Sequence, residues 1–168
     1  MSLVALALAL GVLAGLLLGG RLRHVTGTRL RSVGLLLGGA VGEFAGSRWG
    51  AGAVGTAIVV AGYLLLVGFA LRNAAVTGMV LVAFGLLANV TVIALNDGMP
   101  VRGLPAAATY GARHHAQRPG DRLTGLADVI HLPALGEIVS PGDLVLGLGV
   151  ATVVVAVMRP RRRVVRAS

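Results

Sequence analysis

Long uncharged stretches constrain this chain more than any other feature of its sequence. Residues 2–20, 50–71 and 73–96 contain no Asp, Glu, Lys or Arg. As a helix, the first stretch would extend about 28 Å at 1.5 Å per residue, close to the thickness of a bilayer's hydrocarbon core. These stretches therefore predict helices that cross a membrane.

The composition agrees with a membrane location and excludes two other classes of protein. Of the 168 residues, 56% are hydrophobic and 12% are charged, and a typical soluble domain has about twice that charged share. A chain this apolar is neither an ordinary water-soluble domain nor a disordered one. Because the chain has no Cys, disulfide and thiolate sites are excluded as well. We expect one all-α domain, a polytopic transmembrane helix bundle.

Five spans are expected, and the second carries the weakest signal. Glu43 interrupts that second segment and Arg48 closes it, so it is either a short span or a re-entrant piece, and the span is preferred. No basic residue precedes the first segment, which favours a retained helix over a signal peptide. The expected spans cover about residues 2–20, 33–49, 50–71, 74–96 and 141–158.

Arginine sets the expected orientation, because every basic residue counted toward the net charge of +9 is Arg. With five spans, ten of the arginines lie on one side of the membrane: 21, 23, 29, 31, 72, 159, 161, 162, 163 and 166. The other side has five, at 48, 102, 113, 118 and 122. The excess of basic residues marks the cytoplasmic side. We therefore predict an outside N-terminus, a cytoplasmic C-terminus and an outward loop 97–140.

Glycine stripes predict how the helices pack. The first span has Gly at 11, 15 and 19, and the second has Gly at 34, 38, 42, 46 and 50. Small residues four apart allow the close backbone approach on which helix association in lipid depends, so these two helices are expected to pack tightly. On the fourth span, one face carries Gly at 78 and 85 together with Asn89 and Asn96. The two amides are expected either to form interhelical hydrogen bonds or to line a polar cavity.

Two polar features at or near span ends are further binding candidates. Glu43 is an acid inside a span, which is a functional hypothesis by default, although Arg48 or Arg102 offers it an ion-pair partner. Asp97 follows Asn96 and precedes Gly and Pro, a combination that predicts a helix stop.

The strongest chemical candidate is the pair Asp128 and Asp143. Asp128 lies in a short apolar segment, and Asp143 follows Ser140 and a Pro in the arrangement of a capping box. That capping role explains Asp143 structurally. The alternative is that both carboxyls meet at the outer membrane surface and share a proton, so that one acts as acid and the other as base. Ser140 would then be a binding residue beside them.

The outward loop offers no convincing metal site. His114 and His115 are adjacent, and with His131 they make a poor ligand spacing, so neither a metal nor a cofactor is expected. Residues 105–118 are expected to form a short helix on the membrane surface.

Two resemblances appear at these residues. Nearly the whole chain resembles a bacterial family of small multi-pass membrane proteins of unknown function, through residues 19–21, 72–73, 96–101, 126–128 and 139–143. That resemblance implies a multi-pass topology in a bacterial cytoplasmic (inner) membrane and no activity. Residues 128–130 and 140–143, with Gly147 and Gly149 after them, also resemble the end of lipoprotein signal peptidase. This implies catalytic roles for Asp128 and Asp143, although Ser140 replaces that family's Asn and five spans replace its four.

Two function classes follow. The preferred one is a structural, accessory or lipid-interacting bundle, and the alternative is an aspartyl membrane peptidase that uses the two acids. Membrane lipids are the expected partners, with anionic headgroups at the Arg-rich tail 159–168 rather than nucleic acid. A membrane-protein partner or a second copy of the chain is also considered.

Overall fold

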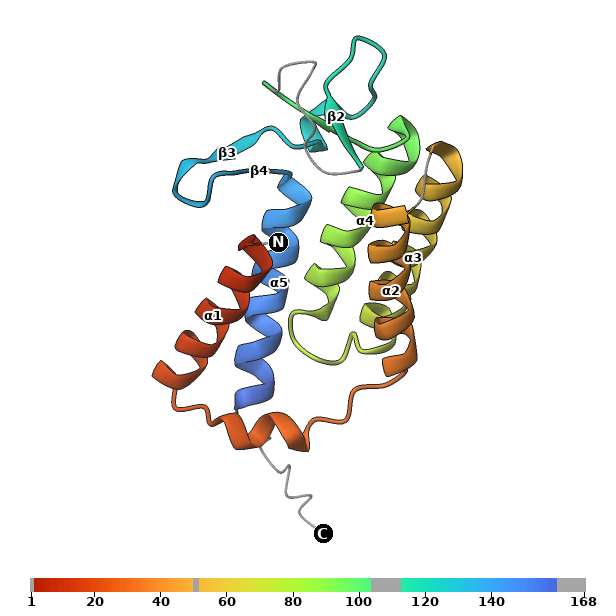
Figure 1. Ribbon diagram of the computed structural model, residues 1–168. Coiled ribbons are helices and arrows are strands. Elements are labelled where there is room, and N and C mark those ends of the chain that lie inside the picture. Colours follow the sequence, from red (N-terminus) through yellow and green to blue (C-terminus); the bar gives the residue numbers. More distant parts are fainter. Residues whose placement is uncertain (1, 50–51, 104–112, 160–168) are drawn as a thin grey trace.

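A computed structural model describes residues 2–49, 52–103 and 113–159, and in them the chain forms a bundle of five α-helices (Figure 1). The helices are α1 (Ser2–Leu17), α2 (Val33–Trp49), α3 (Gly52–Arg72), α4 (Met79–Asn96) and α5 (Pro141–Met158). Short 3-10 helices are η1 (Leu22–Gly27), η2 (Thr124–Leu126) and η3 (Pro133–Leu135). Four short strands are β1 (Met99–Val101), β2 (His114–Ala116), β3 (Ile130–Leu132) and β4 (Glu137–Val139). The all-α helix bundle expected from the sequence is confirmed.

The surface of the bundle is that of a membrane protein. In the described residues, α3, α4 and α5 are long and apolar enough to cross a bilayer, and α1 is a shorter apolar helix. Every helix also directs large apolar side chains outward, for example Leu13, Val41, Val54, Phe84 and Leu148, each more than half exposed. Exposed apolar area on this scale requires surroundings other than water.

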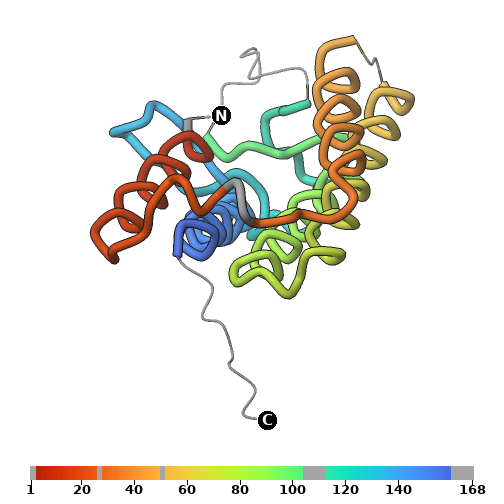
Figure 2. The backbone as a smooth tube through the Cα atoms, turned by 90° about the horizontal axis from the view of Figure 1, so that it is seen from below, coloured from red at the N-terminus to blue at the C-terminus, as the bar shows by residue number. Residues whose placement is uncertain are grey.

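The helices form an open arc in the order α1, α5, α4, α3, α2. Each helix packs against the next in that order, and Figure 2 shows α1 and α2 at opposite ends of the arc, with residues 21–31 crossing between them. The arc order differs from the chain order because α5 returns between α1 and α4.

Glycines make the close helix contacts, but not between the two helices that the sequence suggested. A Cβ on Gly11 would lie 2.9 Å from the Ala151 backbone of α5. A Cβ on Gly46 would lie 2.9 Å from the Gly55 carbonyl of α3. The expectation that the first two spans pack on each other is therefore wrong, since each stripe faces a later helix. Gly34, part of the predicted stripe, faces open space.

The end of the bundle that carries residues 97–140, here called the loop end, begins at a sharp helix stop. Asp97 has a φ of 53° and Gly98 a φ of 142°, and the amide of Gly98 donates to the Ile93 carbonyl at 3.1 Å. The predicted stop is confirmed. The predicted surface helix over 105–118 is wrong at its end, because residues 114–116 pair with β1 as a strand; residues 104–112 lie outside the described part.

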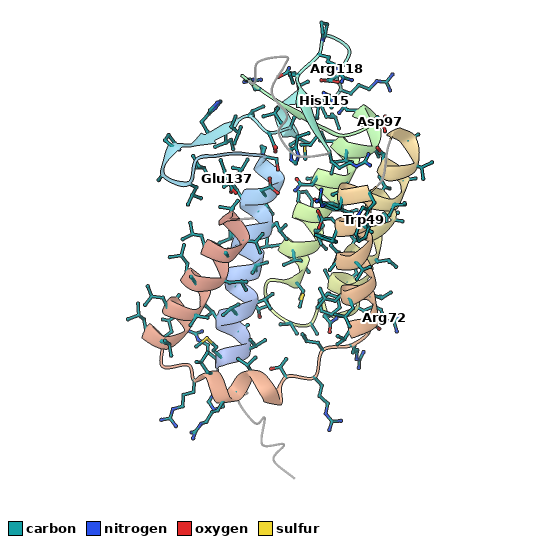
Figure 3. All side chains as sticks on the ribbon, in the orientation of Figure 1. Trp49, Arg72, Asp97, His115, Arg118 and Glu137 are labelled. Carbon is teal, nitrogen blue, oxygen red and sulfur yellow. The ribbon has the colours of Figure 1, made fainter. Side chains whose placement is uncertain are left out.

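The opposite end, here called the arginine end, carries η1 and the last turn of α5. The buried Asn73 side chain accepts from the Arg31 amide at 2.7 Å and donates to the Arg31 carbonyl at 2.9 Å, which fastens the 18–32 connection to α3. Figure 3 shows Arg72 towards this end and Arg118 at the loop end. Which end faces the cytoplasm stays a prediction from the arginine distribution, and tail residues 160–168 lie outside the described part.

Candidate polar site at the loop end

Strand β1 brings two distant polar residues together above α4. One edge of β1 pairs in parallel with β2, so that Met99 lies opposite His114. At the other edge, the Asp128 amide donates to the Pro100 carbonyl at 3.1 Å, and the Arg102 amide donates to the Asp128 carbonyl at 2.9 Å. His114 and Asp128 are thereby held on either side of the same strand.

Asp128 is a buried carboxyl that is only partly satisfied. It is 3% exposed, and its Oδ2 lies 3.4 Å from Nε2 of His114. Its Oδ1 is buried and has no hydrogen-bond partner among the described residues. Burial, and then the negative charge of Asp143, raises the pKa of Asp128 to about 7. Of the two acids singled out in the sequence, Asp143 therefore lies close enough for its charge to act on Asp128.

Asp143, in contrast, has a partner for each carboxylate oxygen. Its Oδ2 accepts from the Ser140 amide at 3.0 Å, while the Ser140 hydroxyl accepts from the Asp143 amide at 2.9 Å. This is the predicted capping box. Its Oδ1 accepts from Nδ2 of Asn89 at 2.6 Å, and the Ser140 hydroxyl donates to Oδ1 of Asn89 at 2.9 Å. One small network thus caps α5 and ties it to α4.

A cavity of about 80 Å³ lies beside this network, near the loop end. Polar side chains come to it from α2, α3, α4, α5 and the loop, so all parts of the arc except α1 contribute. The residues that line it are Glu43, Ser47, Val59, Tyr63, Asn89, Ile93, Met99, Arg113, His114 and Asp143. Asn89 therefore fulfils both of its predicted roles, because it bridges two helices and also lines a polar cavity.

Arg113 fixes the loop to the α2–α3 pair. Its guanidinium donates to the Gly46 carbonyl at 2.8 Å through Nη2 and at 3.1 Å through Nε. Nη1 donates to the Thr56 hydroxyl at 2.9 Å and to the Gly52 carbonyl at 3.3 Å. The Gly46 carbonyl lies in the last turn of α2, where a helix leaves its carbonyls without partners of its own. The bonds to Gly52 and Thr56 extend the attachment to the start of α3.

The other residues predicted as binding candidates have different places. Asn96 lies outside the cavity and holds the loop, since it donates to the Arg122 carbonyl and accepts from the Arg122 amide at 2.7 Å. Asp97 is exposed at the end of α4. Glu43 lines the cavity and, within the described residues, pairs with neither Arg48 nor Arg102. His131 lies on the β3–β4 hairpin, away from the cavity lining.

An apolar groove of about 330 Å³ occupies the other half of the concave side. All five helices contribute to it, and every lining residue is Val, Leu, Phe or Met: Val4, Leu8, Leu36, Leu66, Phe69, Met79, Val82, Leu86, Leu146, Val150, Val153 and Val154. Its volume lies at the lower end of the range for pockets that hold small ligands.

Comparison with known proteins assigns the chain to a family. A family model described as a family of unknown function, DUF5317, matches residues 24–155. The chain belongs to the DUF5317 family. No curated protein and no solved structure matches it. The resemblance to a family of small membrane proteins of unknown function is thus confirmed, and none of these comparisons supports the resemblance to lipoprotein signal peptidase.

The cavity of this DUF5317 protein is lined by several side chains that the sequence interpretation did not assign to it, among them Tyr63, Arg113 and His114. Tyr63 stands inside an uncharged stretch, Arg113 was counted only as a loop charge, and His114 was considered only as a metal ligand. No periodic pattern links them, because a strand pairing and a helix hairpin bring them together. The available signal was a Tyr within an apolar span, since its hydroxyl requires a polar neighbour there.

Proposed function

We propose that this protein binds one membrane lipid in the concave side of its helix arc. The observation that carries the proposal is that single helix faces bear both halves of an amphiphile site. On α4, Met79, Val82 and Leu86 line the groove and Asn89 lines the cavity, at spacings of three and four residues. On α5, the cavity residue Asp143 is followed at the same spacings by groove residues such as Leu146.

The spacing fits one molecule with a polar head and an apolar chain. Leu86 and Asn89 are three residues apart, about 4.5 Å along the helix axis. A lipid whose acyl chain lies in the groove therefore has its polar headgroup directed to the cavity. Between membrane helices, the bilayer supplies acyl chains that can fill an apolar groove. Their transfer from lipid to the groove changes the free energy little, because both surroundings are apolar. The polar end then supplies specificity, as in other ligand sites.

The test fills the groove by mutation. Val150→Trp places a large ring in the groove from α5, and Leu148→Trp makes the same change on a face of α5 that is 61% exposed and outside the groove. Native mass spectrometry of protein extracted in mild detergent is expected to show one retained lipid in the parent protein and in Leu148→Trp. Val150→Trp is expected to lose it. Equal retention by all three proteins would refute the proposal.

A second candidate function is the aspartyl hydrolase. Its support is that Asp128 has an unpartnered buried oxygen and a pKa raised to about 7 partly by Asp143, as expected for an acid–base pair. Against it, both oxygens of Asp143 already accept hydrogen bonds. Asp128→Asn and Asp143→Asn, compared at equal membrane abundance, decide the matter. A hydrolase loses its activity in each variant and nothing further in the double variant, whereas full function in both removes this candidate.

A further inference from the structure

We infer that the polar end of the bound lipid is a primary ammonium group, as in an ethanolamine headgroup. This inference rests on the proposed lipid site and adds the chemical class of its headgroup. It follows from the charge, the hydrogen-bonding capacity and the size of the cavity at the loop end.

The charge around the cavity favours a cation. Two acids, Glu43 and Asp143, line it beside one arginine, Arg113. The nitrogens of Arg113 already donate to the carbonyls of Gly46 and Gly52 and to the Thr56 hydroxyl. Burial lowers the pKa of His114, which disfavours a positive charge on its ring. This balance of charges favours a headgroup whose terminal group is a cation.

The hydrogen-bonding groups of the lining match the donors of an ammonium. A primary ammonium has three N–H donors and no acceptor. The cavity offers the carboxylates of Glu43 and Asp143 and the hydroxyl oxygen of Tyr63. Asp143 has one partner on each oxygen, and a carboxylate oxygen has room for a second.

Glu43 is the lining acid for which a cationic ligand would be most stabilising. It lies within a helix of the bundle, and no Arg, His or Lys forms an ion pair with it in the described parts of the chain. A charge within a membrane helix is costly unless another charge compensates it. A headgroup ammonium supplies that missing charge, whereas Arg48 and Arg102 do not.

The size of the cavity limits the headgroup to a small one. Its 80 Å³ corresponds to roughly two or three waters at about 30 Å³ each. That space accepts the end of an ethanolamine group and excludes a sugar or inositol ring. It also disfavours a trimethylammonium group, which is larger and has no N–H donor.

The experiment measures which lipid remains bound. The full-length protein is placed in nanodiscs containing equal amounts of dioleoyl phosphatidylethanolamine, phosphatidylglycerol and phosphatidylcholine, and the retained lipid is identified by native mass spectrometry. We expect the ethanolamine lipid to exceed each of the other two by about tenfold, the ratio that corresponds to about 1.4 kcal/mol. Glu43→Gln should bring the ratio close to one while still retaining a lipid. The control Glu137→Gln removes an acid outside the cavity lining and should keep the preference.

The outcomes separate this inference from the proposed function. A lipid that is retained without preference, and lost in Val150→Trp, refutes the ammonium assignment and leaves the lipid site standing. No retained lipid, or no loss in Val150→Trp, refutes the lipid site itself. If Glu43→Gln does not fold, Tyr63→Phe serves instead: it removes one acceptor from the lining and should reduce the preference about threefold. An unchanged preference in the folded variants would also overturn the inference.

Discussion

The glycine contacts along the helices and the polar contacts at the loop end hold the bundle together by different chemistry. Along the helices, glycines let backbones approach closely, as where Gly46 faces the Gly55 carbonyl and Gly78 faces the Gly149 carbonyl. At the loop end, side-chain hydrogen bonds join α4 to α5 and the loop to the α2–α3 pair. The first kind of contact depends on shape alone, whereas the second depends on every polar group having a partner.

That difference shows where function is to be sought. A glycine contact is complete once the backbones meet, so it leaves nothing over for a ligand. The loop end keeps an unpartnered oxygen on Asp128 and an acid, Glu43, without an ion-pair partner in the described residues. Buried polar groups are normally satisfied, and exceptions of this kind gather at binding and catalytic sites.

The largest expected effect concerns which end faces the cytoplasm. The arginine distribution predicts a cytoplasmic arginine end. A reporter active only outside the cytoplasm should therefore be active when fused after Arg118 and inactive when fused after Arg163. The result is all or none, and the reverse pattern would invert the orientation of both ends.

A large loss of stability is expected when a glycine contact is filled. In Gly85→Leu, the new Cβ would lie 2.6 Å from the Gly142 carbonyl oxygen and the Leu146 amide, and backbone atoms do not move aside easily. We expect a loss of more than about 3 kcal/mol, seen as loss of the monodisperse peak on size exclusion after heating. Gly34→Leu is the control, since nothing lies within 4 Å of that position. Equal behaviour of the two variants would contradict the packing described here.

A smaller change in stability is expected when pH changes the protonation of Asp128 at the loop end. Because the pKa of Asp128 is raised to about 7 in the folded protein, the folded state holds a proton that the unfolded state releases above pH 4. Stability should therefore fall as pH rises from about 4 to about 7, by up to about 1.4 kcal/mol per pH unit. Thermal unfolding in detergent across that range measures it.

Two variants show whether the slope comes from Asp128. Asp128→Asn cannot titrate, so its unfolding temperature should vary less with pH and should exceed that of the parent protein at pH 8. Asp97→Asn changes an exposed Asp at the end of α4 and should keep the parent slope. A slope that survives Asp128→Asn would assign the pH dependence to another group.

The sequence alone predicted features that depend on neighbouring residues. The stop after Asn96 and the cap at Ser140 are set by a few adjacent residues, and both are present. That glycines would make close contacts between helices was also predictable. Their partners were not, because any of the apolar helices offers a suitable surface and only the full arc decides between them.

The candidate site was predictable only in part for the same reason. Asp128, Asp143, Asn89 and Glu43 attract attention as polar residues in apolar surroundings, and the charge of Asp143 does reach Asp128. The contact between His114 and Asp128 arises from two separate pairings of β1, which no local pattern indicates. The binding role proposed for these residues stays a prediction until the lipid experiments are done.

The smallest predicted effect divides the role of Ser140 into two parts. Its hydroxyl accepts from the Asp143 amide, a cap contributing about 1 kcal/mol, and donates to the buried Asn89 carbonyl oxygen. Ser140→Ala also leaves that oxygen without its donor, which costs about 1 kcal/mol or more of stability in addition to the cap. We therefore expect Ser140→Ala to lower the free energy of unfolding by about 2 kcal/mol. Thr91→Ala, which removes an exposed hydroxyl bonded within α4, should change stability by less than about 0.5 kcal/mol.

A double-mutant cycle separates the two parts. In an Asn89→Ala background the interhelical acceptor is already absent, so Ser140→Ala should cost only the cap, about 1 kcal/mol. The difference between the two backgrounds measures the α4–α5 bond directly. If Ser140→Ala costs the same in both, the hydroxyl acts only as a cap, and α4 and α5 are joined at the loop end through Asp143 alone. Between these two helices, the polar contacts at the loop end would then amount to a single hydrogen bond.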